Sequence, residues 1–196
     1  TQAESSAASD VYKRQVDGVL TAITRGRLVK LHDYNNDGEA DFYEAFFNED
    51  EPDKGWHAYN FDLEVGKDGS FYYGRTGGFS QWSVPGGVVK VSADGKTSTV
   101  IGAGLRVPNG IGKLPDGRIT LGDNQGTYVP ASKISITSPD AFHGAGSWIK
   151  HGDKYDPEKI VQPIVYMPQD LDSSSGGQLW VEKDKRLGPL SGQYFH

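Results

Sequence analysis

Two stretches of the sequence, "LEVGKDGSFYYG" at residues 63–74 and "IGKLPDGRITLG" at residues 111–122, align with each other and indicate the fold class. Superposing Asp68-Gly69 on Asp116-Gly117 brings the apolar positions that follow them into the same phase. Asp-Gly is a preferred dipeptide of tight hairpin turns, and each one here lies between short apolar runs. Each stretch therefore predicts a β-hairpin, and the pair predicts a repeat of 48 residues.

A repeat of this length is typical of one four-stranded blade of a β-propeller. Short β-branched or aromatic runs bounded by Gly, Asp, Asn or Pro dominate the rest of the sequence, and no helical apolar period is sustained. We predict an all-β chain that forms a partial β-propeller of about three to four blades. A propeller buries its sheet edges by closing on itself, so these blades are expected to belong to a larger ring. The alternative is two unrelated Asp-Gly hairpins.

Residues 5–15, "SSAASDVYKRQ", match the translation of a transposase-based sequencing adapter residue by residue. We therefore expect residues 1–15 to be a disordered sequencing artefact and residues 16–196 to be a propeller fragment without its natural N-terminus. The alternative is a natural linker rich in Ser and Ala. The segment has no apolar stretch, so it is not predicted to be a signal peptide.

The composition argues against several classes of function. The formal net charge is −6, whereas a nucleic-acid-binding protein needs a basic face, so we predict no nucleic-acid partner. No apolar run is long enough to predict a membrane-spanning helix. Cysteine is absent, so the sequence offers no disulfide and no thiolate metal ligand.

The segment "DYNNDGEADFYE" at residues 33–44 satisfies the calcium-loop pattern D-x-[DN]-x-[DN]-G-x5-E at every specified position. Ca²⁺ binds about six to eight oxygen atoms, which the alternate residues of a tight loop can supply. In a helical EF-hand the last glutamate would close the site with a bidentate carboxylate, but the flanking segment alternates like a strand, which leaves open that Glu44 points away from the ion. The alternative is an acidic turn that holds no ion. The predicted calcium ligands are Asp33, Asn35, Asp37, Glu39, Asp41 and Glu44.

Three longer segments, residues 56–77, 86–134 and 172–196, carry a resemblance to a known family. The middle one is the most specific, with Gly-Leu-Arg-x-Pro-Asn-Gly, an Asp-Gly hairpin and then Asp-Asn-Gln-Gly. Residues 16–196 resemble the planctomycete-type membrane-bound dehydrogenase propellers, which are distantly similar to soluble quinoprotein glucose and sorbosone dehydrogenases. The resemblance implies a six-bladed ring and an exported protein, so the expected location is periplasmic or extracellular.

In the sugar dehydrogenases, the resemblance also implies pyrroloquinoline quinone held with calcium over the central channel. An Arg before a Pro meets the acidic cofactor there, which matches Arg106, although Val107 stands where those enzymes usually have Asn. The backbone of Asp-Asn-Gln-Gly would face the calcium ion of the cofactor. The alternative for Arg106 is a structural role in which it joins loops by hydrogen bonds. The implied cofactor-binding residues are Arg106, Asn109, Asp123, Asn124, Gln125, Gly126 and Thr127.

The resemblance further implies a catalytic His just before the strand that leads to an Asp-Gly hairpin, and His57 matches that place to within one residue. A His base would take the hydroxyl proton of the substrate while hydride passes to the quinone. The alternative is a structural or exposed His beside Trp56 and Tyr59.

These patterns leave two main functional hypotheses. The first is an exported quinoprotein-like dehydrogenase that oxidises a sugar or related alcohol and passes electrons to a cytochrome c domain. The second is a non-catalytic, calcium-stabilised β-propeller that binds a ligand or partner. A hydrolytic propeller of the lactonase type is a third, for which the sequence offers no compelling metal-ligand set. Propeller architecture alone does not decide among them.

Overall fold

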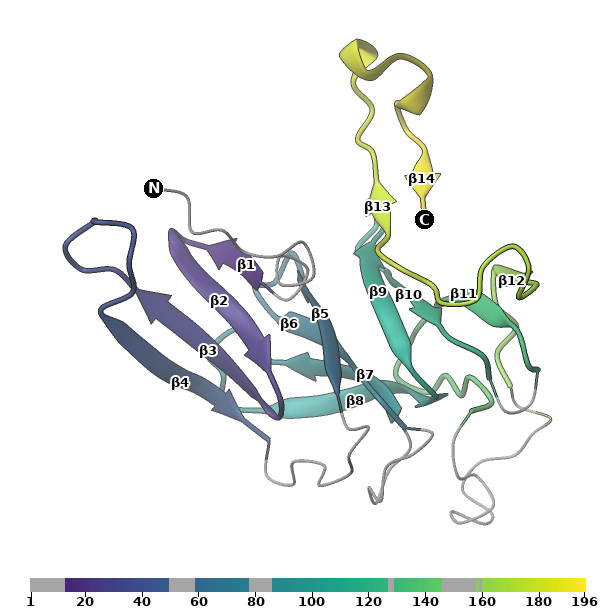
Figure 1. Cartoon of the computed structure of the whole chain (residues 1–196), viewed down its shortest axis with the longest axis horizontal. Coiled ribbons are helices and arrows are strands. Elements are labelled where there is room, and N and C mark those ends of the chain that lie inside the picture. The colour runs from purple at the N-terminus through teal and green to yellow at the C-terminus, as the bar shows by residue number, and fades with distance from the viewer. Residues whose placement is uncertain (1–12, 50–58, 78–85, 127–128, 146–157, 159) are drawn as a thin grey trace.

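The computed structural model describes residues 13–49, 59–77, 86–126, 129–145, 158 and 160–196. In these ranges the chain forms three four-stranded antiparallel sheets and one two-stranded hairpin (Figure 1). The strands of each four-stranded sheet follow chain order, so each strand pairs with the next one along the sequence. No helix in these ranges is long and apolar enough to cross a membrane. The predicted all-β fold is confirmed.

The strands have the following bounds. The first sheet contains β1 (Lys13–Val16), β2 (Val19–Thr24), β3 (Arg27–His32) and β4 (Phe42–Asn48). The second contains β5 (Asn60–Val65), β6 (Phe71–Arg75), β7 (Gly86–Val91) and β8 (Ser98–Leu105). The third contains β9 (Pro108–Lys113), β10 (Ile119–Asp123), β11 (Ser132–Ile136) and β12 (Val165–Met167). The hairpin pairs β13 (Leu179–Trp180) with β14 (Tyr194–Phe195), and the 3-10 helix η3 (Lys185–Leu190) lies between them.

The first strands of successive sheets are neighbours, because β1 contacts β5, β5 contacts β9, and β9 contacts β13. Two hydrogen bonds between β5 and β9 join residues that are 49 and 48 positions apart in the sequence, so the register between these strands is nearly constant. Ile111 N–H donates a hydrogen bond to Asp62 Oδ2 at 2.7 Å, and Lys113 Nζ donates to the Val65 carbonyl. These two strands therefore run in the same direction, one repeat apart. We call the row β1, β5, β9 and β13 the inner wall.

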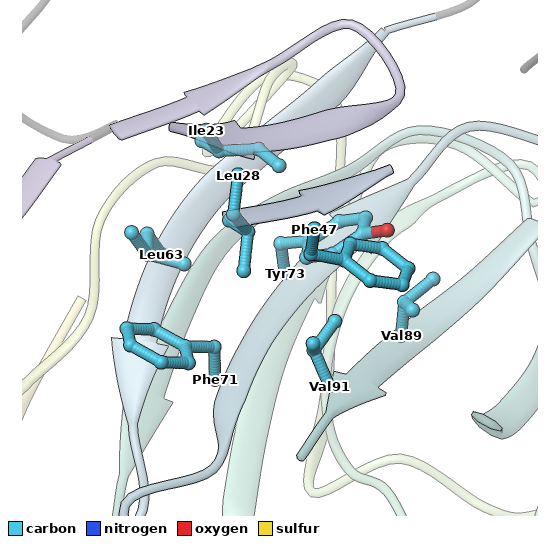
Figure 2. Packing of buried hydrophobic residues seen from close by; sticks show 8 residues of the cluster. All are labelled: Ile23, Leu28, Phe47, Leu63, Phe71, Tyr73, Val89 and Val91. Carbon is cyan, nitrogen blue, oxygen red and sulfur yellow. The ribbon is translucent and has the colours of Figure 1, made fainter. Parts of the chain in front are cut away.

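A buried apolar cluster joins the first and second sheets, as Figure 2 shows. Its side chains come from β2, β3 and β4 on one side and from β5, β6 and β7 on the other. Burying an aliphatic or aromatic side chain of this size contributes about 1.5–3 kcal/mol, so the cluster is a main source of stability. The members are Ile23, Leu28, Phe47, Leu63, Phe71, Tyr73, Val89 and Val91.

A second cluster fills the space between the second and third sheets. It includes Ile111, Ile119 and Leu121, which the sequence repeat aligns with Leu63, Phe71 and Tyr73 of the first cluster. The repeat thus places corresponding residues in corresponding cores. Its remaining buried members are Tyr72, Val88 and Leu105.

The predicted Asp-Gly turns form hairpins at both positions. Gly69 has φ +79° and Gly117 has φ +93°, a backbone region that a residue with a Cβ rarely adopts. In each turn the Asp carboxylate also accepts a backbone hydrogen bond two residues on, from Ser70 at 3.1 Å and from Arg118 at 3.0 Å. The side chain and the glycine together fix the reversal.

The predicted boundary between residues 15 and 16 falls inside β1. Lys13–Val16 pairs in antiparallel register with Val19–Ala22 of β2. Asp17 and Gly18 connect them with φ values of 50° and 82°, as in a tight two-residue hairpin turn. The assignment of residues 1–15 to an adapter stays a prediction, and residues 1–12 lie outside the described ranges.

Candidate functional site

Arg106 lies in the two-residue connection between β8 and β9, where the chain passes from the second sheet to the third. We call residues 106 and 107 the Arg106 turn. The Arg106 carbonyl accepts a hydrogen bond from Gly77 N–H at 2.9 Å, and Arg106 Nη1 donates to the Asn124 carbonyl at 3.4 Å. Asn124 N–H in turn donates to the Val107 carbonyl at 3.2 Å. The turn is therefore bonded to both sheets.

Asp123 ends β10 directly beneath this turn and is fully buried. Its Oδ1 accepts the backbone N–H groups of Arg106 at 3.0 Å and of Val107 at 2.9 Å. Its Oδ2 lies 3.5 Å from Lys133 Nζ. Burial raises the pKa of the Asp123 carboxyl, whereas the Lys133 charge and the two amides act in the opposite direction.

Lys133, in β11, is also buried, and its ammonium group donates to the carbonyl of His143. His143 is 1% exposed, and its Nε2 lies 3.4 Å from Thr137 Oγ1. Its Nδ1 has no hydrogen-bond partner among the described residues. Burial, and then the Lys133 charge, lower the pKa of His143 to about 3, so the imidazole is neutral near pH 7. Neither Lys133 nor His143 was among the site residues predicted from the sequence.

The structure separates the other predicted cofactor residues into two groups. Asn124, Gln125 and Gly126 follow Asp123 in the loop after β10, and Gln125 has φ 41°. The buried Asn124 Oδ1 has no hydrogen-bond partner among the described residues. Asn109 instead donates through Nδ2 to the Ser175 carbonyl at 2.9 Å, which joins β9 to the segment before β13. Thr127 and His57 lie outside the described residues.

The predicted calcium loop connects β3 with β4. The Asp33 carboxylate accepts the backbone N–H groups of Asp37 at 3.2 Å and Gly38 at 2.9 Å. Asp37 Oδ1 accepts Glu39 N–H at 2.8 Å. Asp41 Oδ2 accepts a further backbone N–H at 2.7 Å, and the Asn35 side chain donates to Asp37 Oδ2 at 3.0 Å. Side-chain oxygens of the predicted ligands thus already accept hydrogen bonds from N–H groups of the same loop.

Glu44 lies in β4 and points to the neighbouring strand, where its Oε2 is 2.7 Å from His32 Nε2. The helical arrangement that would close the calcium site with this carboxylate is absent, because the segment is a strand. In the ranges that the structure describes, no group of three or more His, Cys, Asp or Glu side chains is arranged to hold a metal ion.

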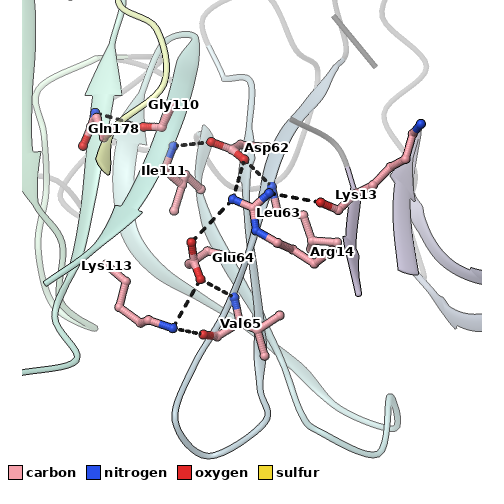
Figure 3. Close-up of polar contacts among 10 residues, drawn as sticks. All are labelled: Lys13, Arg14, Asp62, Leu63, Glu64, Val65, Gly110, Ile111, Lys113 and Gln178. Carbon is pink, nitrogen blue, oxygen red and sulfur yellow. Dashed lines mark hydrogen bonds and ion pairs between the residues drawn. The ribbon is translucent and has the colours of Figure 1, made fainter. Parts of the chain in front are cut away.

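A second polar cluster, which the sequence analysis missed, lies on the inner wall (Figure 3). Asp62 has φ 56° at an irregularity in the pairing of β5 with β6, and its carboxylate reaches Ile111 N–H in β9. Arg14 Nη2 lies 3.8 Å from Asp62 Oδ1 and 3.5 Å from Glu64 Oε2. Lys113 Nζ lies 3.3 Å from Glu64 Oε1. An acidic residue inside the apolar run "NFDLEV" is the signal that marks this place.

Comparison with known proteins identifies the fold. No protein-family model and no curated protein matches the sequence. The PQQ-bound aldose sugar dehydrogenase of Streptomyces coelicolor superposes with a TM-score of 0.61 at 15% identity, over 90% of this chain and 55% of that one. The soluble aldose sugar dehydrogenase of Escherichia coli, in its apo form, gives 0.56 at 13% identity, over 88% and 56%. This chain is a partial β-propeller.

A glucose dehydrogenase structure also superposes, with a TM-score of 0.51 at 16% identity, over 76% of this chain and 52% of that one. The propeller fragment thus spans about half the length of the structures that it matches. Each four-stranded sheet is one blade, and the inner wall is the set of first strands around which such blades are arranged. The Arg106 turn lies at the junction of the second and third blades.

Proposed function

We propose that this chain is part of a quinoprotein-like dehydrogenase that oxidises a sugar or related alcohol. The observation that carries the proposal is the Arg106 turn, which holds a guanidinium group at a junction between two blades. The fold likeness to sugar dehydrogenases, one of them PQQ-bound, supports the same hypothesis. The planctomycete-type membrane-bound family, an exported location and electron transfer to a cytochrome c domain are further parts of this proposal.

The described residues fit an acidic quinone cofactor. Arg106 supplies a positive charge suited to a carboxylate, and the buried Asn124 Oδ1 offers an acceptor that no described residue uses. Pyrroloquinoline quinone, when bound, supplies the acceptor for hydride from the substrate. Arg106 would bind and orient its carboxylates, and the loop at residues 124–126 would contribute backbone carbonyls. His57 remains the proposed base for the hydroxyl proton.

A titration of the purified chain with pyrroloquinoline quinone in the presence of CaCl₂ tests the proposal. We expect saturable quenching of tyrosine and tryptophan fluorescence in the wild type. Arg106→Gln should weaken binding by about tenfold or more, because a charge-assisted hydrogen bond contributes about 1.5–3 kcal/mol. Arg118→Gln is the matched control, because Arg118 is paired with Asp116 in an exposed turn.

Two results would contradict the dehydrogenase hypothesis. One is a wild-type chain that does not bind the quinone, and the other is binding that Arg106→Gln leaves unchanged. Absence of quinone-dependent dye reduction with a broad panel of sugars, measured on the complete gene product, would favour the non-catalytic binding module instead.

Calcium binding by the loop at residues 33–41 is part of both functions. We propose that Ca²⁺ would replace the internal donors that the loop's oxygens now accept, and would thereby fix the connection between β3 and β4. Thermal unfolding should shift upward with CaCl₂ but much less with MgCl₂; at 100 times the dissociation constant, the added stability is about 2.7 kcal/mol.

The variant Asp33→Ala should abolish this calcium-dependent shift. Asp94→Ala is the control, because Asp94 fixes an exposed Asp-Gly turn through comparable backbone contacts. A shift that persists in Asp33→Ala would place the ion elsewhere.

A further inference from the structure

Two buried charges lie directly beneath the Arg106 turn. Asp123 is 0% exposed and Lys133 is 4% exposed. Removing two charges from water costs several kcal/mol for each ion, and their attraction repays that cost only when the surrounding groups are well arranged. A hydrophobic pair would fill the same space at lower cost, so the polar contacts of this pair are informative.

One oxygen of the Asp123 carboxylate accepts hydrogen bonds only from the Arg106 turn. Oδ1 accepts both consecutive N–H groups, those of Arg106 and Val107, at 3.0 and 2.9 Å. These two hydrogen bonds satisfy both N–H groups of the turn with one buried acceptor. Asp123 therefore fixes the backbone from which the Arg106 side chain projects.

Lys133 connects that carboxylate to two other segments. Its Nζ lies 3.5 Å from Asp123 Oδ2 and donates to the His143 carbonyl. A Cβ placed on Gly126 would lie 3.5 Å from the same Nζ, so the ammonium group lies close to the loop that follows Asp123. One cation thus pairs with Asp123 in β10, donates to the segment that contains His143 and lies near the loop that follows Asp123.

We propose that Asp123 and Lys133 are positioning residues that fix the Arg106 turn, which carries the guanidinium group, and the loop at residues 124–126, which carries backbone carbonyls, as one preorganised surface for the proposed quinone. The effect of this positioning on ligand affinity rests on the proposed function, because the ligand is the acidic quinone proposed there. Neither residue needs to touch the ligand, since both act through the backbone and side chain of Arg106.

Amide hydrogen exchange of the wild type and of Lys133→Met tests the positioning claim without any ligand. We expect exchange at the Arg106 and Val107 amides to accelerate by about tenfold or more, because the buried Asp123 carboxyl without its counter-ion takes up a proton and becomes a weaker acceptor. Lys113→Met is the matched control. Lys113 also pairs with a carboxylate and donates to a backbone carbonyl, but it does so on the inner wall with Glu64 and Val65.

The double variant Asp123→Asn/Lys133→Met keeps the test decisive if Lys133→Met fails to fold. It preserves the shape of both side chains and leaves no unpaired buried charge. We expect the same two amides to exchange faster in it, because a neutral amide oxygen is a weaker acceptor. Unchanged exchange at Arg106 and Val107, or equal acceleration in Lys113→Met, would overturn the proposal.

Titration with pyrroloquinoline quinone and CaCl₂ supplies the second readout. The double variant should weaken binding by about tenfold while Lys113→Met binds like the wild type. Accelerated exchange together with unchanged quinone affinity in the double variant would overturn the ligand part of the proposal. If the wild type does not bind the quinone, the proposed function fails, and the exchange result still decides whether Asp123 and Lys133 position the turn.

Discussion

Asp62 and Asp123 are both buried carboxylates that accept backbone N–H groups from a neighbouring segment, yet their counter-ions differ. Asp62 faces Arg14, whose side chain is 35% exposed, at 3.8 Å. Asp123 faces Lys133, whose side chain is 6% exposed, at 3.5 Å. Solvent can replace Arg14 but has little access to Lys133. The inner-wall cluster is therefore open to solvent at Arg14, whereas loss of either Asp123 or Lys133 would leave a buried group without its partner.

The largest difference between the two clusters is expected in the free energy of unfolding when each carboxylate is removed. Asp123→Ala leaves Lys133 buried without its partner, so we expect a loss of about 3–5 kcal/mol in the free energy of unfolding. Asp62→Ala leaves Ile111 N–H without its acceptor, but Arg14 can turn to water, so the loss should be about 1–3 kcal/mol. Urea denaturation measures both values. A larger loss for Asp62→Ala would reverse the comparison.

The stability of the protein should depend on pH through His143, whose carbonyl accepts a hydrogen bond from Lys133. Its folded pKa, about 3, is below the ordinary value of 6.5, so neutral His143 stabilises the fold above pH 6.5. That contribution should fall between pH 6.5 and about 3, at up to about 1.4 kcal/mol per pH unit, because unfolded His143 gains a proton first.

The variant His143→Leu isolates this contribution. The unfolding free energy of the wild type minus that of the variant should decrease as the pH falls below 6.5. Chemical denaturation from pH 7 to pH 4 measures it. A difference that stays constant would contradict the buried, neutral state of His143.

The smallest effect is expected at Arg14. Because this side chain is partly exposed, Arg14→Gln should cost no more than about 1 kcal/mol, and the cost should diminish in 0.5 M NaCl. The loss caused by Lys133→Met should change little with salt, because its partner is fully buried. Equal salt dependence in the two variants would show that both clusters are solvated alike.

The site was predictable only in part. The motif around Arg106 and the loop after Asp123 were selected together, and the structure places Arg106, Asp123 and Asn124 in one hydrogen-bonded group. Asn109 was selected with them, but its side chain donates a hydrogen bond to the Ser175 carbonyl instead. Lys133 and His143 were not selected, because neither lies in a recognisable motif and only the folded chain brings them beneath the turn.

Features that depend on near neighbours in the chain were predictable from the sequence alone. Asp-Gly dipeptides between alternating apolar runs specify hairpins within about a dozen residues, and their recurrence 48 residues apart indicates a chain built of equivalent blades. Which charges meet follows only from the packing of the blades. Asp62 accepts a hydrogen bond from Ile111 in another blade, and Asp123 accepts one from Arg106 across a sheet junction. Burial strengthens these contacts, and burial exists only after the blades have packed against one another.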